Sequence, residues 1–419
     1  MHPRGVVKSR RVSLSQLALS VLLAGCAYPP SIAATVPGEA ATRARPLPET
    51  RVPATRTPSE APQEPFCLDA ALWDRIWVYD LDLDGPPQAL SVGPGDDYWF
   101  LHQHSAVRRA PDGDYTRYGF GEAPGCAGCS SESNGTIAIA PDGSAWIGLV
   151  NGILEVSRDG TVRFLDSAGI FPEGGGDKGP LVLVVDTAGG VWASNTMGWL
   201  CHMQGEEWLC VDLNELPSAT GSQSRPDTSV GYATSGVTGR ADQIWFGTSL
   251  GFVLSYQSGR YALENLQTLF PGFGAIYAIG AMAFDERSGS LWAVETAPPE
   301  CGEGLLTDTI GVFSRGADGQ WLGFEKSLFS TGIEDDCYGA FTSIAVTQDG
   351  RVWAGMLMRH DLVYYENEKW YSVRGEPLPS TPTVPWTLCS NVRDLAPSAS
   401  GHLLVSNLDG VFEYLGTDH

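Results

Sequence analysis

Two kinds of residue in this 419-residue chain have spacings suited to holding a metal ion. His102 and His104 are separated by one residue, and His360 occupies the corresponding place several repeats later. Alternate residues of a strand share one side, so the two neighbouring imidazoles are expected to point together. A complete site would still need a carboxylate or a third histidine, and solvated loop histidines are the simpler interpretation.

An acidic run gives the second metal-like pattern. Asp80, Asp82 and Asp84 are followed by Gly85, which is how a calcium-binding loop begins, but position twelve of that loop would be Ser91 instead of glutamate. An outward-facing acidic strand edge explains the run more simply. We therefore assign no cofactor, and calcium or magnesium is the only divalent cation considered.

The pair Cys126 and Cys129 forms a Cys-x-x-Cys motif, which could be redox-active, half of a metal site or a disulfide. The chain has no second Cys-x-x-Cys and no thioredoxin-like helical pattern beside this one. A structural disulfide is the favoured interpretation.

The remaining cysteines also suggest disulfides. Apart from Cys26, the chain has an even number of cysteines, which in an exported protein indicates paired thiols. Cys201 and Cys210 flank a Gln-Gly turn on neighbouring predicted strands. The other proposed pairs are Cys301 with Cys337, in loops on one face, and Cys67 with Cys389, beside the point where the domain closes.

The N-terminus has the layout of a secretory signal peptide, with basic residues from Arg4 to Arg11 and a short apolar run from Leu17 to Ala24. The run ends in Leu-Ala-Gly-Cys at Cys26, which resembles the lipobox of bacterial lipoproteins. The resemblance implies cleavage after residue 25, lipid attachment to Cys26 and anchoring to the cell membrane or outer membrane. The domain would then lie outside the cytoplasm.

Composition separates the rest of the chain into a tether and a globular domain. Residues 26–66 are rich in Pro, Ala and Thr and lack apolar periodicity, so they are expected to form a tether, with the folded domain at 67–419. The formal net charge is −23, from 49 acidic and 26 basic residues, and the domain carries this acidity. A surface of this sign repels phosphate, which excludes nucleic acid as a partner.

Regularly spaced tryptophans reveal a repeat in residues 67–419. Each lies in a short apolar strand after a turn: Trp99, Trp146, Trp192, Trp245, Trp292 and Trp353, with Leu404 in the seventh place. Thr136 to Leu165 shows four strands joined by Asp-Gly, Asn-Gly and Asp-Gly hairpins. Four antiparallel strands per unit at this period predict an all-β fold, a seven-bladed β-propeller.

The last repeat, from Val392, contains only three strands, and the missing outer strand is predicted at Trp73 to Leu81. Pairing the two ends of the domain would close the ring and remove an exposed edge.

Ile244 to Tyr256, IWFGTSLGFVLSY, resembles the two-component-regulator propeller repeat. That family's members occupy the periplasmic part of sensor kinases, so the resemblance implies a sensing or binding role. Its tryptophans and glycines are blade-packing and turn residues.

Long insertions mark one face of the predicted ring. They fall between the second and third strands of a blade or between blades, for example at Gly119 to Gly135 and Glu295 to Thr309. This face is predicted to bind a protein, peptide or glycan. The candidate ligand-binding residues are the three histidines of the metal-like pattern, His102, His104 and His360, together with four residues chosen by blade position, Asn151, Asn195, Ser249 and Asn407.

An enzyme remains the alternative. Propellers of the streptogramin B lyase and gluconolactonase type also have turn-Trp repeats and act through a metal near the axis. No Gly-x-Ser-x-Gly or His-Glu-x-x-His motif indicates a hydrolase here. We therefore expect binding without catalysis, with a metal-dependent lyase or lactonase as the second hypothesis.

Overall fold

The computed structural model describes residues 6–8, 73–76, 85–131, 135–172, 179–216, 229–271, 276–296, 310–329, 341–356, 362–373, 378, 392–407 and 410–415. Several residues singled out from the sequence lie outside these ranges, namely Cys26, Cys67, Asp80, Asp82, Asp84, Cys301, Cys337, His360 and Cys389. In the ranges described, no helix has both the length and the apolar character needed to cross a membrane.

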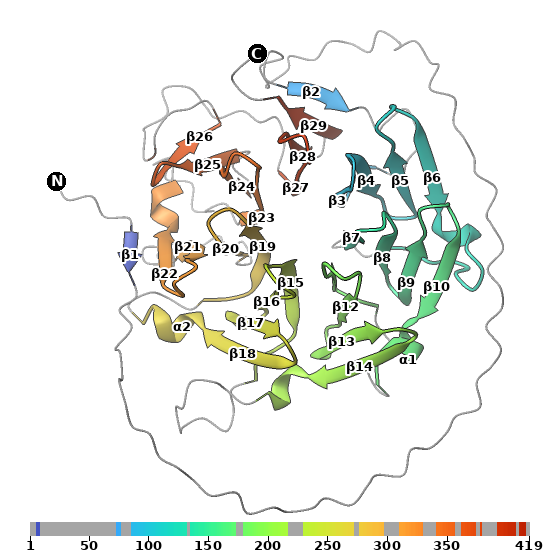
Figure 1. Cartoon of the computed structure of the whole chain (residues 1–419), viewed down its shortest axis with the longest axis horizontal. Helices are drawn as coiled ribbons and strands as arrows, with labels where there is room; N and C mark the ends of the chain where they lie inside the picture. Colours follow the sequence, from blue (N-terminus) through green and yellow to red (C-terminus); the bar gives the residue numbers. More distant parts are fainter. Residues whose placement is uncertain are drawn as a thin grey trace, which may run out of the picture.

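Seven antiparallel sheets surround a common axis, which confirms the seven-bladed β-propeller (Figure 1). From the inner to the outer strand, blade 1 comprises β3 (Ala89–Gly93), β4 (Asp97–Leu101), β5 (Ser105–Arg109) and β6 (Tyr115–Gly119), and blade 2 comprises β7 (Ile137–Ile139), β8 (Ala145–Leu149), β9 (Gly152–Val156) and β10 (Val162–Asp166). Blade 3 comprises β11 (Val182–Val185), β12 (Val191–Ser194), β13 (Trp199–Gln204) and β14 (Glu207–Asp212), and blade 4 comprises β15 (Ala233–Thr238), β16 (Ile244–Thr248), β17 (Phe252–Gln257) and β18 (Arg260–Asn265).

Blades 5 to 7 follow the same order. They comprise β19 (Ile279–Asp285), β20 (Ser290–Glu295), β21 (Ile310–Arg315) and β22 (Trp321–Glu325); β23 (Phe341–Val346), β24 (Val352–Met356), β25 (Leu362–Glu366) and β26 (Lys369–Ser372); and β27 (Asp394–Pro397), β28 (Leu403–Asn407), β29 (Gly410–Tyr414) and β2 (Trp73–Ile76). Each inner strand contacts the inner strands of the blades on both sides.

The ring closes as the sequence predicts. β2 pairs antiparallel with β29, with Trp73 opposite Tyr414 and Ile76 opposite Val411. The outer strand of the last blade therefore comes from the start of the domain, beside the chain's C-terminal end (Figure 1). The Trp73 and Tyr414 rings lie 5.1 Å apart and pack in one cluster with Trp353.

A short strand, β1 (Val6–Lys8), lies within the predicted signal peptide and pairs with the outer strand of blade 5. Its partner is β22, with Val6 opposite Phe324. This pairing adds a fifth strand to that sheet.

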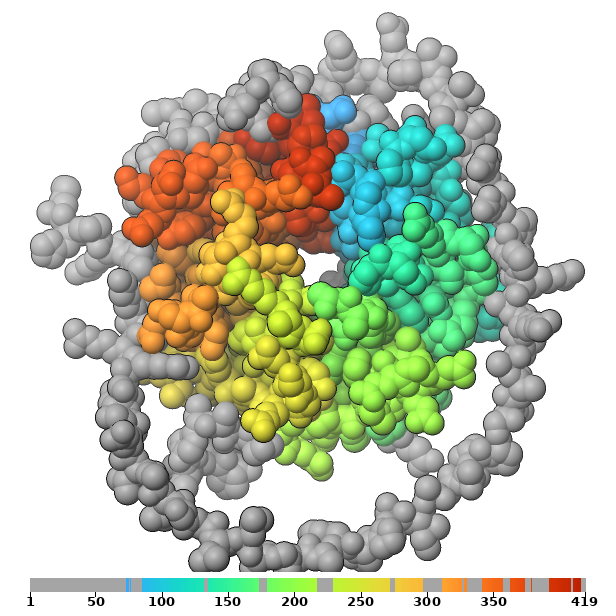
Figure 2. All heavy atoms as spheres, viewed as in Figure 1, coloured from blue at the N-terminus to red at the C-terminus, as the bar shows by residue number. Residues whose placement is uncertain are grey.

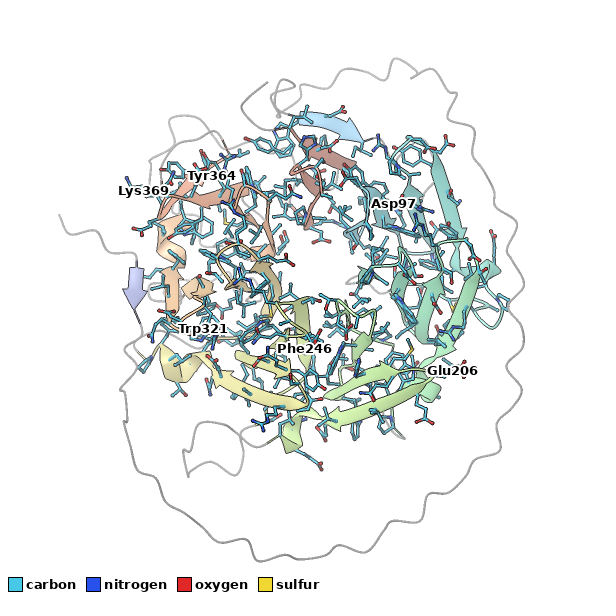
Figure 3. All side chains as sticks on the ribbon, viewed as in Figure 1. Asp97, Glu206, Phe246, Trp321, Tyr364 and Lys369 are labelled. Carbon is cyan, nitrogen blue, oxygen red and sulfur yellow. A yellow bond between two sulfur atoms is a disulfide. The ribbon has the colours of Figure 1, made fainter. Side chains whose placement is uncertain are left out.

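The repeated tryptophans form the cores between blades. All six lie in the second strand of a blade and are at most 6% exposed, and Leu404 is fully buried in the seventh. In the side-chain view, Phe246 lies among packed side chains, whereas Glu206 projects from the outer rim of the ring (Figure 3). The predicted role of the tryptophans as packing residues is confirmed.

Aspartates in the short turns serve backbone geometry. In the turns that join the first to the second strand and the third to the fourth, a carboxylate accepts a hydrogen bond from the amide two residues later, as Asp142 does from Ser144. The same contact occurs at Asp112, Asp159, Asp186, Asp318 and Asp349. Glycines with positive φ follow, such as Gly113 (90°) and Gly350 (86°). We call the side of the ring with these turns the turn face.

A single helical turn follows the outer strand of five blades on the opposite side, which we call the insertion face. The five turns are η2 (Phe120–Glu122), α1 (Ser167–Ile170), η3 (Leu213–Glu215), α2 (Leu266–Leu269) and η4 (Lys326–Phe329). In four of them the first amide donates a hydrogen bond to a carbonyl in the loop between the second and third strands of the same blade, which we call the second connection. One example is Ser167 N to Asn151 O, at 2.9 Å. Asp166, Asp212 and Asn265 cap three of them. The insertion face thus rests on an ordered base.

The closing strand generates a prediction about stability. Trp73→Ala removes a buried indole from the joint between the two ends of the domain, so it should lower the free energy of unfolding by about 3–5 kcal/mol. Leu209→Ala is the control, because Leu209 is 53% exposed on the outer strand of blade 3 and should change stability by less than about 0.5 kcal/mol. Urea unfolding measures both, and equal stability of the two variants would show that β2 does not close the ring.

Candidate functional site

A cavity of about 1060 Å³ lies on the axis of the ring, where the space-filling view shows an opening at the centre (Figure 2). Its wall is formed by the beginnings of all seven inner strands. Thr196 and Thr296, from the second connections of blades 3 and 5, also line it. Inner strands begin at the insertion face, so the cavity belongs to that side of the channel.

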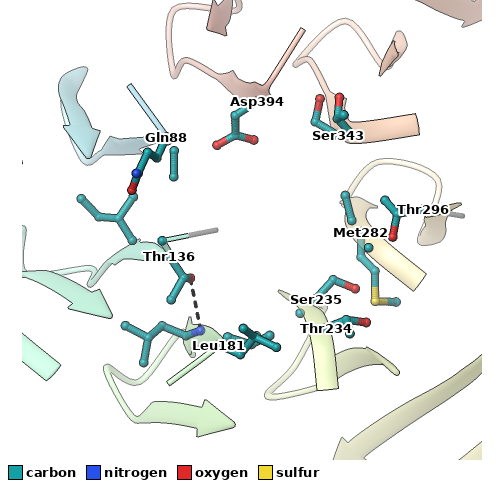
Figure 4. Close-up of a pocket in the computed structure, with 18 of the residues that line it drawn as sticks. Gln88, Thr136, Leu181, Thr234, Ser235, Met282, Thr296, Ser343 and Asp394 are labelled. Atoms are coloured by element: carbon teal, nitrogen blue, oxygen red, sulfur yellow. Dashed lines mark hydrogen bonds between the residues drawn. The ribbon is translucent and has the colours of Figure 1, made fainter. Parts of the chain in front are cut away.

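Polar side chains of the wall join neighbouring blades (Figure 4). Thr234 Oγ1 donates to Ile279 O in the next blade, and Thr342 Oγ1 donates to Val392 O, each at 2.8 Å. Thr136 Oγ1 accepts from Leu183 N at 3.3 Å. These contacts link the inner strands of neighbouring blades around the axis.

Asp394 makes the corresponding bridge at the closing joint. Its Oδ2 accepts from Leu90 N in blade 1 at 2.7 Å, and its Oδ1 accepts from Leu395 N at 2.8 Å. The carboxylate points into the cavity (Figure 4). It is the only carboxylate among the described residues of the wall, where Arg393 is the one basic residue.

Aligning the blades on their first turns shows that Asp394 occupies a position of small, uncharged residues. The equivalent residues of blades 1 to 6 are Ala89, Thr136, Val182, Ser235, Ala281 and Ser343. Thr136 accepts its hydrogen bond from the same backbone position of the next blade as Asp394 does. A charge is therefore not required for the bridge.

Burial raises the pKa of Asp394 to about 6, from an ordinary value of 3.8. The hydrogen bonds from Leu90 and Leu395 lower the pKa but do not offset the loss of hydration. Among the described residues, no basic side chain forms an ion pair with this carboxylate. Its charge is thus poorly compensated within the protein.

The two neighbouring histidines do not point together, contrary to the expectation from strand alternation. Residues 102–104 form a bend between β4 and β5, so the period of two does not apply. His102 is fully buried, with Nδ1 3.0 Å from Gly85 O, whereas His104 is exposed. Within the ranges that the structure describes, no three His, Cys, Asp or Glu side chains group closely enough to hold a metal ion.

The polar residues chosen by blade position shape the turns beside the cavity. Asn195 Oδ1 accepts from the amides of Met197 and Trp199, and Asn407 Oδ1 accepts from Gly410 N. Ser249 Oγ accepts from Tyr232 N, which lines the cavity.

Asn151 is exposed, and its carbonyl accepts from Ser167 N. None of these four residues belongs to the described wall, and their contact with a ligand stays a prediction.

Two predicted disulfides are confirmed. Cys201 and Cys210 are opposite each other on β13 and β14 and are bonded. Cys126 is bonded to Cys129, and Cys129 Sγ lies 3.2 Å from Asn151 Oδ1. The Cys-x-x-Cys motif therefore stabilises a connection of the insertion face.

Exposed apolar side chains also gather on the insertion face, and sequence reasoning missed them. Val150, Met197 and Leu250 lie between the second and third strands of blades 2, 3 and 4, and Tyr277 lies two residues before the inner strand of blade 5. Their exposed fractions are 37%, 56%, 49% and 44%. We call these four residues the apolar arc. The first three occur at equivalent turns of consecutive blades, and this was the sequence signal that could have identified them.

The fold resembles those of solved propellers that differ widely in sequence. Streptogramin B lyase aligns with a TM-score of 0.55 and 11% identity over 81% of this chain and 95% of that chain. YCF48, solved bound to D1 peptide, aligns with a TM-score of 0.54 and 12% identity over 83% of this chain and 96% of that chain. The RRP9 WD40 repeats align with a TM-score of 0.55 and 11% identity over 82% of this chain and 97% of that chain. These likenesses show the fold alone.

No protein-family model matches the chain, and no curated protein matches its sequence. The resemblance to the two-component-regulator repeat accordingly stays a prediction.

The raised pKa of Asp394 predicts a defined pH dependence of stability. The folded state binds this proton more tightly than the unfolded state, so the contribution is most favourable below about pH 4. It is lost as the pH rises to about 6, by up to about 3 kcal/mol. Asp394→Asn, which stays neutral, should therefore gain stability relative to the wild type between pH 4.5 and 7.5 in urea unfolding.

Glu206→Gln makes the same charge change at an exposed turn and is the matched control. Its stability difference from the wild type should vary little with pH. A stability difference between Asp394→Asn and the wild type that is the same at pH 4.5 and 7.5 would contradict the raised pKa of Asp394.

Proposed function

We propose that this chain is an exported, lipid-anchored propeller that binds a protein or peptide through its insertion face. The observation that carries the proposal is the coincidence of the axial cavity and the apolar arc on one face. Exposed apolar side chains that cluster beside a concavity are typical of interaction sites. The long insertions belong to the same face.

The fold comparisons support a binding role. YCF48 was solved with a bound peptide, and WD40 repeats share the same architecture. A small arc of apolar side chains with a polar cavity beside it offers anchor contacts together with hydrogen-bonding groups, the combination that peptide-binding surfaces use. A glycan remains a further possible ligand of the same face, and the binding role extends to sensing of that ligand.

A metal-dependent lyase or lactonase is the second candidate, and the likeness to streptogramin B lyase favours it. The described wall of the cavity offers one carboxylate, several hydroxyls and no imidazole to such a reaction. Analysis for a stoichiometric divalent ion, together with a panel of lactones and esters, tests it. Turnover that is lost on metal removal would establish the enzyme and overturn a purely binding role.

The apolar arc gives a direct test of peptide binding. The purified full chain is used to select peptides from a bead-bound hexapeptide library, and the affinity of the retained peptides is measured. The double variant Met197→Ser, Leu250→Ser should weaken binding by roughly tenfold or more, because truncating a well-packed anchor typically costs more than about 1 kcal/mol.

Leu209→Ser is the matched control, because Leu209 is equally exposed but lies on the outer strand of blade 3. It should leave binding unchanged. Equal losses of peptide affinity in Leu209→Ser and in the double variant would argue against the insertion face as the binding site.

The proposed anchor is tested separately through Cys26. Cys26→Ser removes the thiol that would carry the lipid, so the chain should move from the membrane fraction to the soluble fraction of a bacterial host. Mass spectrometry should find acyl chains on the wild-type chain alone. Unchanged fractionation of the variant, or an unmodified Cys26 in the wild type, would rule out the lipid anchor.

A further inference from the structure

We propose that the axial cavity receives one lysine or arginine side chain of a bound peptide, with Asp394 as its counter-ion. This inference rests on the proposed peptide-binding function and specifies the chemistry of the ligand. It arises from a charge at a place where the fold requires none.

The bridge between blades 7 and 1 does not explain why residue 394 is acidic. In blade 2 the hydroxyl of Thr136 accepts the equivalent backbone hydrogen bond, and it does so without a charge. The other equivalent positions hold alanine, valine or serine. A carboxylate at this joint therefore adds a property that the architecture does not need.

The charge also has a cost for the folded protein. Burial disfavours the ionised form, and the only compensating contacts are the two backbone amides of Leu90 and Leu395. A half-buried carboxylate that is incompletely compensated gains from a cation that enters its site, because the attraction is screened less there than at a fully exposed site. A cation bound at the axis would therefore be stabilised by Asp394.

The geometry of Asp394 leaves room for this cation. A carboxylate has about four acceptor positions, and the hydrogen bonds from Leu90 N and Leu395 N occupy one on each oxygen. The side chain points into the cavity, opposite neutral side chains such as Thr136 and Ser235 (Figure 4). These hydroxyls can accept further hydrogen bonds from an ammonium or guanidinium group.

A basic residue of a peptide fits both features of the insertion face. A lysine or arginine side chain is long and thin, so it can enter an axial cavity while the peptide backbone remains at its mouth. Neighbouring apolar residues of the peptide would then contact the apolar arc, of which Met197 and Leu250 are the most exposed members. The predicted ligand is therefore a peptide segment that places a basic residue beside apolar residues.

Ionisation of Asp394 is expected to control how strongly a cationic peptide binds, because the groups around it do not titrate. The strands packed against β27 are β3, β23, β24 and β28, and none of them contains a side chain that titrates. Gln88, which precedes β3 and lines the cavity, is also neutral. Arg393 and Tyr232 are the other ionisable residues of the described wall, and neither contributes to the pKa of Asp394. Binding of a cationic peptide should thus weaken as the carboxyl gains a proton.

The experiment uses the purified full chain and a bead-bound library of hexapeptides whose N-termini are acetylated, so that lysine supplies the only amines. At pH 7.5 the wild type should retain peptides enriched in lysine or arginine at one position, next to apolar residues. Two variants, Asp394→Thr and Asp394→Asn, remove the charge; threonine reproduces the hydrogen-bonding arrangement seen at Thr136. Both should lose the basic preference but keep the apolar one.

Isothermal titration calorimetry with a selected lysine peptide then measures how much the Asp394 substitutions weaken binding. Asp394→Thr should bind at least about tenfold more weakly, the order expected for a hydrogen bond to a charged group. For the wild type the affinity should fall up to about tenfold between pH 7.5 and 5, since the bound lysine favours the ionised carboxylate. The variants and the acetyl-lysine form of the peptide should lack this pH dependence, and Glu206→Gln should behave as the wild type.

The outcomes separate this inference from the proposed function. Retained peptides without a basic preference, or with one that persists in both Asp394 variants, would overturn the role of Asp394 while peptide binding stands. Failure of the folded wild type to retain any peptide would overturn the proposed peptide binding itself. Unfolding curves of both variants show whether each is folded, and either folded variant is sufficient for the comparison.

Discussion

Closure of the ring between its last and first blades is the constraint on which the rest of the structure depends. Two contacts achieve it at different radii. At the outer rim, β2 pairs with β29 and places Trp73 against Tyr414. At the axis, Asp394 bonds the amide of Leu90. Without this joint the first and last blades would expose strand edges, and the seven inner strands would have no fixed positions around a common cavity.

The two faces of the ring use their polar residues differently. On the turn face, acidic residues are occupied by backbone amides and by basic neighbours, as with Asp97 and Arg108 at 2.7 Å. These acidic residues therefore have a structural role and are no guide to a ligand. On the insertion face, the half-buried Asp394 forms no ion pair with a basic side chain among the described residues, and apolar side chains of blades 2 to 5 are exposed. The sign and position of individual groups, more than the net charge, indicate where a ligand binds.

The sequence predicts the architecture well because its signals are local and repeated. The strand tryptophans, the Asp-Gly turns and the WDRI strand each report on neighbours in the chain or on a pairing that the missing strand requires. The site is harder to predict because it joins residues from all seven blades. His102 and His104 were expected to share a side, yet a bend separates them. Asp394 becomes conspicuous only when the repeats are aligned and the equivalent residues of the other blades prove to be uncharged.

The central claim is that a peptide binds at the insertion face with a basic side chain directed to Asp394. A crystal structure of the chain with a library-selected lysine peptide tests it most directly. The account predicts the lysine Nζ within hydrogen-bonding distance of the Asp394 carboxylate, with apolar peptide residues against Met197 and Leu250. A peptide bound on the turn face or along the outer strands, or one whose lysine remains outside the cavity, would contradict it.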